Sequence, residues 1–571
     1  MSKASEALTR AFAPLAPRSS MVGYAGAGLL LVGSLLSWSY NREILGNISI
    51  AFNPGALQIF ALVLAVLALF LLLLHDGFIL RSMGAVTNTP RAVGSLGTWS
   101  LLFMALVVVA IAGTAPGLVN IDPGAWVAFV GALALFVGGR AVPLRDPKEI
   151  LHVRFATWVE ILVIAVMMLA GLFAAAYALD LEDGWVFILF LVLLASVFAA
   201  ANRATWLSWI GLVGERNKKV LILSAFVVAF LFPFTQNGSD ANMSIATQVI
   251  IFATTALGLN IVVGLAGLLD LGYIAFLGAG AYVGATLSYS AFATIHWKPP
   301  FIVVMIIGAC VSATLGLIIG TPTLRVSGDY LAIVTLAFGE IFRLAMFNLD
   351  GNNGPNLTRG PNGIPAIPDL EFFGFNFGDT HSIFGIPINR FGNYYFFLLV
   401  VAAIIILVFT RLNNSRIGRG WVAIREDEKA AEAMGVNTFG LKLFAFAGGA
   451  FLAGLAGTVK AHQDVSVTPD QYVFLESAFL LAAIVLGGMG TVAGVLIGAT
   501  ILKLLPEKLR FVSDYRLLIF GLLLVLIMRF RPEGLVASHR RQLEFHEEDT
   551  ELAEHVEHAH LEATAGSEGT A

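Results

Sequence analysis

Charged side chains are scarce in this chain of 571 residues, in which Asp, Glu, Lys and Arg together make up only 13%. Soluble globular domains carry about 25% charged residues, so the composition excludes a water-soluble fold for most of the chain. Hydrophobic residues reach 58%, and the mean hydropathy is +0.83. Apolar runs of about 18 residues or more recur, each long enough to cross a bilayer as a helix. The composition therefore predicts an integral membrane protein.

Cysteine and the common catalytic motifs are also missing. The single cysteine, Cys310, lies in an apolar run, which excludes a disulfide framework and a thiolate metal cluster. There is no GxxxxGK(S/T) loop, and Gly278-x-Gly280 lies within a membrane helix with no strand before it, so it is not a dinucleotide fingerprint. No cluster of His, Asp and Glu indicates an enzyme. We expect no cofactor, no metal and no catalytic residue in this chain.

Hydropathy predicts an all-α fold, a polytopic transmembrane helix bundle of about 15–16 membrane segments, some of them broken. The expected spans lie near residues 21–38, 55–74, 97–114, 123–138, 156–179, 184–201, 219–234, 244–266, 271–292, 300–320, 329–348, 393–410, 441–460, 475–502 and 515–530. Most of this surface must face membrane lipid, and nothing indicates a nucleic-acid partner.

The charges between the spans favour one orientation. Lys and Arg gather in the loops on one side and Asp and Glu on the other, which places both termini in the cytoplasm. Segment 475–502 leaves two alternatives. As one span it places the arginine-rich end after Arg529 outside, whereas two broken helices meeting near Gly487–Gly490 return that end to the cytoplasm. We favour the broken form because it violates the charge rule less, and interrupted helices are tolerated where protein buries them.

A shift in composition near Asp240 predicts three parts. Residues 1–241 form an N-terminal transmembrane extension without a motif to which chemistry can be attached. Residues 242–536 form a core in which glycines and polar residues become organised, and this core includes a charged cytoplasmic loop at 411–440. Residues 537–571 form an acidic cytoplasmic tail without apolar periodicity, which we expect to be disordered.

Glycine is abundant, with 58 in the chain, and two runs stand out. Gly258–Ala285 carries small residues at close spacing, and Phe479–Ala499 repeats the pattern with Gly490, Gly494 and Gly498 four residues apart. Such spacing is typical of helices that pack closely through small faces. The same helices can also line a path and kink at glycine, as in transporters built from internal repeats. The two interpretations are compatible.

Ionisable residues enter the span near 329–348. Residues at membrane depth that can carry a charge are functional candidates by default, because burying them is costly. Glu340 and Arg343 lie three residues apart and can pair on one helix face. The alternative to a functional role is an ion pair at the membrane interface, where long side chains reach water.

The loop after Arg411 is the strongest functional signal in the residues themselves. Six Lys and Arg lie between Arg411 and Lys442, and the positive-inside rule places them in the cytoplasm. A helix is predicted from Gly420 to Met434. The residues expected on its apolar side are Trp421, Ile424, Ala431 and Met434. Charges of both signs on so short a helix favour docking to a soluble protein over binding to anionic lipid.

Several long motifs in order resemble the permease subunit of branched-chain amino acid ABC transporters, the LivM type. They are LDLGYIAFLGAGAY, RVSGDYLAIVTLAFGEIFR, GPNGI, IREDEKAAEAMG, VLGGMGTVAGVLIGA and RPEGL, between Asn242 and Val536. The resemblance implies a bacterial inner-membrane permease that pairs with a LivH-type permease and two ATP-binding cassette ATPases. Those partners would bind ATP and Mg, and a periplasmic binding protein would deliver leucine, isoleucine or valine. Permeases of urea or of other amino acids and amides are similar, so they remain an alternative substrate class.

The resemblance also assigns a role to the charged loop. The charged loop looks like the helix that couples such permeases to their ATPases, although Lys429 stands where the family pattern has glutamate. The expected coupling residues are Arg425, Glu426, Asp427, Glu428, Lys429, Ala430, Ala431 and Gly435. Candidates for the translocation path are Asn260, Gly264, Asp270, Tyr273, Tyr330, Thr335, Glu340, Gly488, Gly490 and Gly494. A stand-alone channel or ion-coupled transporter is the rival class, but it would need several paired ionisable groups at mid-membrane and no docking loop.

The orientation gives a direct test. A cysteine introduced at Asn353 should react with an impermeant thiol reagent in intact cells, and one at Asn414 only after permeabilisation, because the basic loops stay inside. Labelling of Asn414 before Asn353 would reverse the whole topology.

Overall fold

The computed structural model of the chain describes most of it. The described residues are 13–39, 57–78, 87–114, 117–142, 155–181, 183–324, 329–352, 354–372, 374–383 and 385–508, with 515, 518, 521–522, 525, 529 and 534–536. Position 353, most of the expected span 515–530 and the acidic tail lie outside the described residues.

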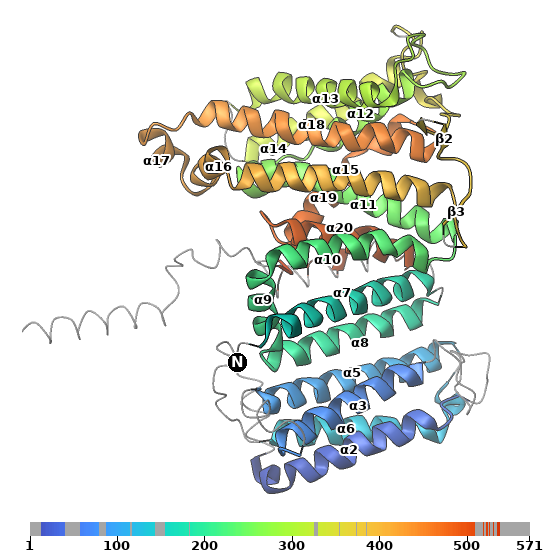
Figure 1. The fold of residues 1–571 in the computed structure, drawn as a ribbon, viewed down its shortest axis with the longest axis vertical. Helices are drawn as coiled ribbons and strands as arrows, with labels where there is room; N and C mark the ends of the chain where they lie inside the picture. Colours follow the sequence, from blue (N-terminus) through green and yellow to red (C-terminus); the bar gives the residue numbers. More distant parts are fainter. Residues whose placement is uncertain are drawn as a thin grey trace, which may run out of the picture. The chain divides into compact units, whose positions relative to one another are not determined.

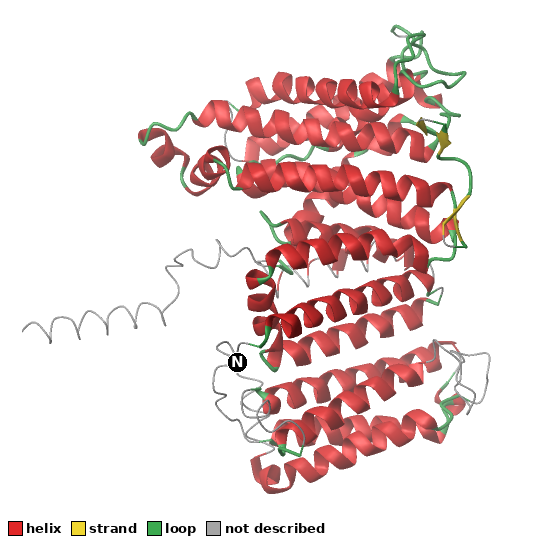
Figure 2. Cartoon of the chain, in the orientation of Figure 1, coloured by secondary structure: helices red, strands yellow, loops and turns green. Residues whose placement is uncertain are grey.

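The predicted all-α membrane bundle is confirmed. Among the described residues, 12 helices are long and apolar enough to cross a membrane. Figure 2 shows strand only as short pieces beside the ends of helices. Two of the expected spans, 21–38 and 271–292, fall short of that length test, because Ser19–Leu35 and Ile274–Thr286 are short helices. The second helix of the expected span 475–502, Val492–Lys508, is also too short.

The chain divides into two compact units, Met1–Asn237 with Lys508–Ser513, and Gly238–Glu507 with Asp514–Ala571. The helices of the first unit are η1 (Ala13–Arg18), α2 (Ser19–Leu35), α3 (Leu57–His75), α5 (Thr89–Thr114), η2 (Leu118–Asn120), α6 (Pro123–Ala141), α7 (Thr157–Asp180), α8 (Gly184–Arg203), α9 (Trp206–Arg216), α10 (Lys218–Leu231) and η4 (Phe232–Thr235).

Helices α2 and α6 of the first unit run antiparallel in close backbone contact. A Cβ placed on Gly33 would lie 2.5 Å from the Ala128 nitrogen, and one on Gly138 would lie 2.6 Å from the Gly23 nitrogen. Small residues permit this approach, which side chains of any size would prevent. Close packing of α2 on α6 therefore explains Gly33 and Gly138.

The short helix α9 was absent from the predicted spans. It is amphipathic and too short to cross a bilayer, so a search for long apolar runs passes over it. Its last residue, Arg216, forms an ion pair of 3.4 Å with the buried Glu160 of α7, and Asn217 donates a hydrogen bond of 2.8 Å to the same carboxylate. The buried Glu160 carboxylate in the first turn of α7 thus has its charge and hydrogen-bonding groups paired by the residues that end α9.

The second unit contains the interrupted helices. Its elements are α11 (Asp240–Asn260), the π-helical turn η5 (Ile261–Leu265), α12 (Ile274–Thr286), α13 (Phe301–Thr323), α14 (Asp329–Asn348), η6 (Gly360–Asn362), β1 (Glu371–Phe372), β2 (Phe375–Asn376), β3 (His381–Ile383), β4 (Ile386–Ile388), α15 (Arg390–Asn413), α16 (Arg416–Glu426), α17 (Glu428–Ala433), α18 (Thr438–Asp464), η7 (Pro469–Tyr472), α19 (Phe474–Gly487) and α20 (Val492–Lys508). The strands form two antiparallel hairpins, β1–β2 and β3–β4.

Helix α18 is the centre of this unit and lies between α13 and α15 (Figure 1). Its glycines admit neighbouring backbones. A Cβ on Gly454 would lie 2.8 Å from the carbonyl oxygen of Gly308 in α13, and one on Gly457 would lie 3.0 Å from the nitrogen of Ala281 in α12. In Figure 1, α16 and α17 project at one end of these helices, and the strands lie at the opposite end.

Segment 475–502 is two helices, as the favoured alternative predicts. Helix α19 ends at Gly487 and α20 begins at Val492. The two fold back on one another, since a Cβ on Gly494 would lie 2.5 Å from the Gly487 oxygen and one on Gly498 would lie 3.1 Å from the Gly487 nitrogen. At the other end of the hairpin, Lys503 pairs with Glu476 at 3.0 Å. The hairpin therefore returns the chain to the side from which it entered.

A matched pair of substitutions tests the packing of the first unit. Gly26→Val should destabilise it by about 1–3 kcal/mol or more, because a Cβ there would lie 2.8 Å from the Ala134 carbonyl carbon and 2.9 Å from the Gly131 oxygen, neither of which can move aside. Gly28→Val, on the same helix but with nothing within 4 Å, is the control. Thermal unfolding in detergent should show a lower Tm for Gly26→Val only. An equal fall in Tm for both variants would mean that the loss of stability comes from the lower helix propensity of valine and not from packing.

Candidate functional site

The charged loop folds as two helices, not one. The Ser415 hydroxyl caps α16 by accepting from the Ile417 and Gly418 nitrogens. The chain is then extended at Asp427, with φ −154° and ψ 107°, and α17 starts at Glu428. The prediction of a continuous helix from Gly420 to Met434 is therefore wrong. Asp427 is a strong N-cap residue, and its carboxylate accepts from the Ala430 nitrogen at 3.0 Å, so a new helix begins there.

An aromatic anchor holds α16 to the bundle. The Trp421 side chain is fully buried, its Nε1 donates to the Leu441 carbonyl at 2.7 Å, and its ring stacks on Phe444 of α18 with centroids 5.9 Å apart. Ile424 and Ala431 are buried as expected. Met434 is not, since 85% of it is exposed. The break at Asp427 rotates α17, which takes Met434 off the apolar side.

Three consecutive acidic residues of the loop, Glu426, Asp427 and Glu428, each have an internal partner. Glu426 pairs with Arg425 at 2.7 Å, Asp427 caps α17, and Glu428 pairs with Lys442, whose side chain is largely buried. Around them lies an exposed tip, formed by Glu426–Ala430 and Glu432–Gly435. This tip offers charges of both signs and one large apolar side chain to a partner.

The glycine that follows α17 has a conformational role. Gly435 has φ +83°, its nitrogen donates to the Glu432 carbonyl at 2.9 Å, and nothing lies within 4 Å of an added Cβ. A left-handed residue after a helix ends it and satisfies its last carbonyls, and glycine adopts that conformation without strain. Gly435 therefore fixes the direction in which the chain returns to α18.

Arg425 reaches from α16 to the interrupted helix α11–η5. Its Nη1 donates to the Gly264 carbonyl at 3.0 Å. A Cβ on Gly267, which has φ +72°, would lie 2.5 Å from Arg425 Cγ, so the stem of Arg425 lies directly on the backbone. π-Turns leave the regular pattern of helix hydrogen bonds and occur frequently at functional sites. The charged loop and the glycine-rich segment are thus one connected structure.

The other side of the same turn contacts the tip of the α19–α20 hairpin. Asn260 is fully buried, its Oδ1 accepts from the Gly490 nitrogen at 2.9 Å, and its Nδ2 donates to the Thr491 carbonyl at 3.4 Å. A Cβ on Gly264 would lie 2.7 Å from the Gly490 nitrogen. The structure therefore brings together three of the expected path residues: Asn260, Gly264 and Gly490.

The linker between η5 and α12 holds two more, Asp270 and Tyr273, and contacts a third, Thr335. Asp270 is buried, and its Oδ1 accepts from the Gly272 nitrogen at 2.9 Å. The Tyr273 hydroxyl donates to the Gly449 carbonyl at 2.6 Å, and Thr335 of α14 accepts from the Leu271 nitrogen at 3.1 Å. Within the described part of the chain, the second Asp270 oxygen has no hydrogen-bond partner.

Two candidates lie apart from this cluster. Tyr330 is 70% exposed on α14. Glu340 accepts from Arg343 Nε at 2.9 Å, and Arg343 also pairs with Asp470 at 3.4 Å. The expected pairing of Glu340 with Arg343 on one helix face is present.

The last two candidates belong to the α19–α20 hairpin. Gly488 has φ +124°, and Gly494 faces Gly487 across the hairpin. The end of the RPEGL motif closes this tip, because the Leu535 and Val536 nitrogens donate to the carbonyls of Leu486 and Gly487, each at 2.9 Å. Those carbonyls are the ones that the end of α19 would otherwise leave unpaired.

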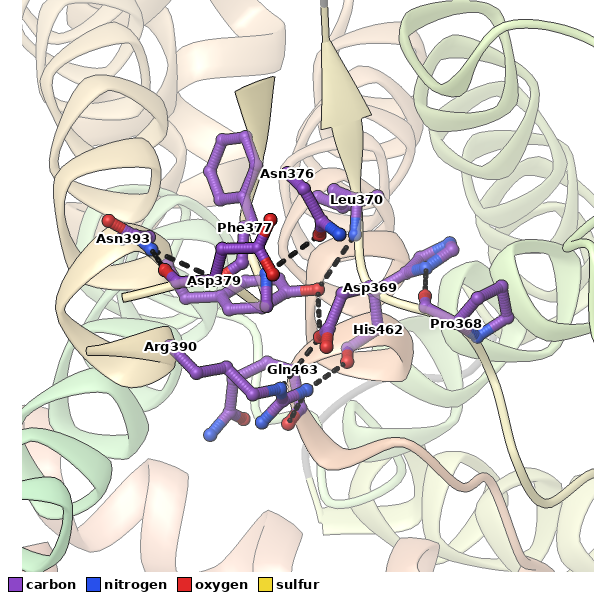
Figure 3. A network of polar contacts seen from close by, with 12 residues as sticks. Pro368, Asp369, Leu370, Asn376, Phe377, Asp379, Arg390, Asn393, His462 and Gln463 are labelled. Carbon is purple, nitrogen blue, oxygen red and sulfur yellow. Dashed lines mark hydrogen bonds and ion pairs between the residues drawn. The ribbon is translucent and has the colours of Figure 1, made fainter. Parts of the chain in front are cut away.

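A polar network that the sequence did not indicate lies at the opposite end of the unit (Figure 3). Asp369 accepts from Arg390 Nε at 2.6 Å and from the Tyr394 hydroxyl at 3.0 Å. Arg390 Nη2 also donates to the carbonyls of His462 and Gln463, at 2.9 and 3.1 Å. An arginine at a helix C-terminus satisfies its last carbonyls and interacts favourably with the helix dipole. The network ties the loop before α15 to the end of α18.

The described residues hold no group of three His, Cys, Asp or Glu arranged for a metal ion. A helical bundle with interrupted helices in its interior and an exposed charged helix pair at one end is the architecture of a membrane transport permease. The family model described as "Branched-chain amino acid transport system / permease component" matches residues 241–528. The chain belongs to this family.

The chain is also similar to individual permease proteins. The high-affinity branched-chain amino acid transport system permease protein LivM of Salmonella typhimurium is 38% identical over 339 residues, which cover 57% of this chain and 77% of that protein. LivM of Escherichia coli is 39% identical over the same shares. The permease protein LivH of Escherichia coli is 31% identical over 124 residues, 21% of this chain and 40% of that protein. No solved structure matches the chain.

The hairpin is open to a test with a matched control. Gly494→Leu should separate α19 from α20 and lower the Tm of the purified protein, because its Cβ would lie 2.5 Å from the Gly487 oxygen. Gly448→Leu in α18 has nothing within 4 Å and should leave the Tm close to that of wild type. A Gly494→Leu protein as stable as Gly448→Leu would contradict the close hairpin.

Proposed function

We propose that this chain is a permease subunit of an ATP-driven importer of branched-chain amino acids, and that the exposed tip of α16–α17 receives the work of ATP hydrolysis. The observation that carries this proposal is the construction of the loop. A fully buried Trp421 fixes α16 rigidly to α18, while the tip from Glu426 to Gly435 is exposed. A firmly anchored helix with an exposed tip that carries charges of both signs is suited to bind a protein partner and to move with it.

The partners follow from the same architecture. Among the described loops, the α16–α17 tip is the candidate docking surface, which would supply one of two such surfaces in a paired transporter. The relatives include both a LivM and a LivH permease protein. We propose a second, LivH-type permease beside this chain and two ATP-binding cassette ATPases that bind ATP and Mg beneath the pair. A periplasmic binding protein would deliver leucine, isoleucine or valine to the opposite end.

The orientation belongs to the proposal. The α16–α17 end would face the cytoplasm of a bacterial inner membrane, with both termini on that side, because the basic loops gather there. The end that carries β1–β4 and the Arg390 network would face the periplasm. Residues 242–536 would form the transport core, 1–241 an amino-terminal transmembrane extension, and 537–571 a cytoplasmic tail.

Transport would proceed by alternating access. Movement of α16–α17 would bias the core between outward-open and inward-open states, since a ligand or partner shifts an equilibrium by its difference in affinity for the two states. The buried cluster around Asn260, Gly264 and Gly490, with Asp270, Tyr273 and Thr335 beside it, would lie along the path. Interrupted helices at mid-membrane are the usual site of substrate in transporters.

The exposed tip is the place to test docking. Changing Glu426, Asp427 and Glu428 together to alanine would also remove a helix cap and two ion pairs. Met434→Asp combined with Lys429→Glu changes only the exposed tip, so the permease should still fold. Substrate-stimulated ATP hydrolysis and co-purification of the ATPases should fall by about 10-fold or more, as for a central interface contact.

Glu371→Lys, on the exposed strand β1 at the opposite end, is the control and should retain both ATPases. Full recruitment and stimulation in the Met434/Lys429 variant would remove the tip from the docking surface.

A further inference from the structure

Two polar side chains connect the same π-turn to different parts of the chain. Arg425 donates to the Gly264 carbonyl within η5 at 3.0 Å. Asn260, the last residue of α11, bonds the tip of the α19–α20 hairpin at Gly490 and Thr491. Between Asn260 and Gly264 lie only three residues, Ile261, Val262 and Val263, all buried. The docking helix is thus one short turn away from the hairpin.

We propose that Arg425 and Asn260 are positioning residues that transmit the movement of α16 through η5 to the break between α19 and α20. The linkage rests on the proposed function, since it needs a partner that moves α16. In this proposal, movement passes from the docking loop through η5, and the α19–α20 hairpin receives it.

The linkage has few flexible parts. Gly264 and Gly490 carry no side chains, so backbone meets backbone, and a Cβ on Gly264 would lie 2.7 Å from the Gly490 nitrogen. The Arg425 stem lies against Gly267, where a Cβ would come within 2.5 Å of Cγ. Closely packed groups have discrete arrangements and pass a displacement on instead of absorbing it.

We take the π-turn η5 as the part of the linkage that changes conformation, between a π-helical and an α-helical form. A π-turn holds one more residue per hydrogen-bonded ring than an α-turn, so its conversion to α-helix moves the residues after it along and around the axis. Its Ala266 nitrogen donates to the Ile261 carbonyl at 3.1 Å, and the Leu268 nitrogen donates to the Val262 carbonyl at 3.0 Å. A pull on the Gly264 carbonyl by Arg425 acts at the centre of this turn.

The anchoring of α16 makes the direction of transmission specific. Trp421 holds the helix to Leu441 and Phe444 on α18, while Arg425, one turn further, holds it to η5. A tilt of α16 about the Trp421 anchor displaces Arg425 relative to α18. The displacement therefore reaches η5 and, through Asn260, the hairpin tip.

The experiment separates docking from transmission in the assembled transporter, reconstituted in vesicles with its ATPases and binding protein. Arg425→Met keeps the stem on Gly267 and removes the guanidinium, and Asn260→Ala removes both bonds to the hairpin. Uptake of leucine per ATP hydrolysed should fall about 2- to 30-fold in each. Both variants should still recruit the ATPases. The double variant should be no worse than the worse single variant, because two groups in one linkage are not additive.

Ser312→Ala is the matched control, since it also removes one buried hydrogen bond, at 2.8 Å to the Phe276 carbonyl, elsewhere in the same unit. It should leave uptake per ATP unchanged. If Asn260→Ala does not assemble, Asn260→Ser takes its place with the same expected loss.

Three results would overturn the linkage: unchanged uptake per ATP in both variants, losses that multiply in the double variant, or loss of ATPase recruitment in Arg425→Met, which would make Arg425 a docking residue. Failure of the proposed function is distinguishable from these. In that case the wild-type chain would recruit no ATPase, or ATP would not drive its uptake.

Discussion

Hydrocarbon offers no hydrogen-bond partner to a backbone amide or carbonyl, so every place where a membrane helix stops inside the bundle must be satisfied by protein. Among the described residues of the second unit, helices stop at 266–273 and at 488–491. Side chains from distant elements complete the bonds there: Asn260 for Gly490, Ser477 for Ile274 and Arg425 for Gly264. The arrangement of α11, α12, α14 and α19 around the core depends on this requirement.

The same requirement explains why polar and glycine residues occur together in the core. At an interruption a second backbone can also come close to the exposed amides and carbonyls, and only residues without large side chains allow this approach. Gly264 meets Gly490, and Gly487 meets Gly494, at distances that a Cβ would fill. The first unit uses glycine for a different purpose, because α2 and α6 are continuous helices that merely pack closely. Close packing thus accounts for the contact glycines of α2 and α6, whereas Gly264, Gly487, Gly490 and Gly494 of the second unit lie beside the interruptions.

Features that depend on neighbouring residues in the sequence could be predicted from it. Apolar length gave the membrane helices, charge favoured the broken form of 475–502, and helical periodicity placed Trp421 and Ile424 on the buried side. The break at Asp427 was missed because the periodicity continues across it, although an N-cap residue followed by a helix was a readable signal. The contacts that build the site could not be predicted from the sequence, because they join distant residues. Arg425 and Gly264 lie 161 residues apart, and Gly490 and Asn260 lie 230 residues apart. The Arg390 network was missed for the same reason, because its members read separately as ordinary loop charges.

The closing of the hairpin tip by Leu535 and Val536 has a consequence for biosynthesis. A membrane protein is inserted from its amino terminus onward, so α19 and α20 enter the bilayer before the residues that complete their bonds have been made. Until Val536 emerges, the carbonyls of Leu486 and Gly487 lack the amides that satisfy them in the finished fold. The tip that Asn260 contacts therefore matures last, and a ribosome that stops before Gly534 leaves a core that is threaded through the membrane but not closed.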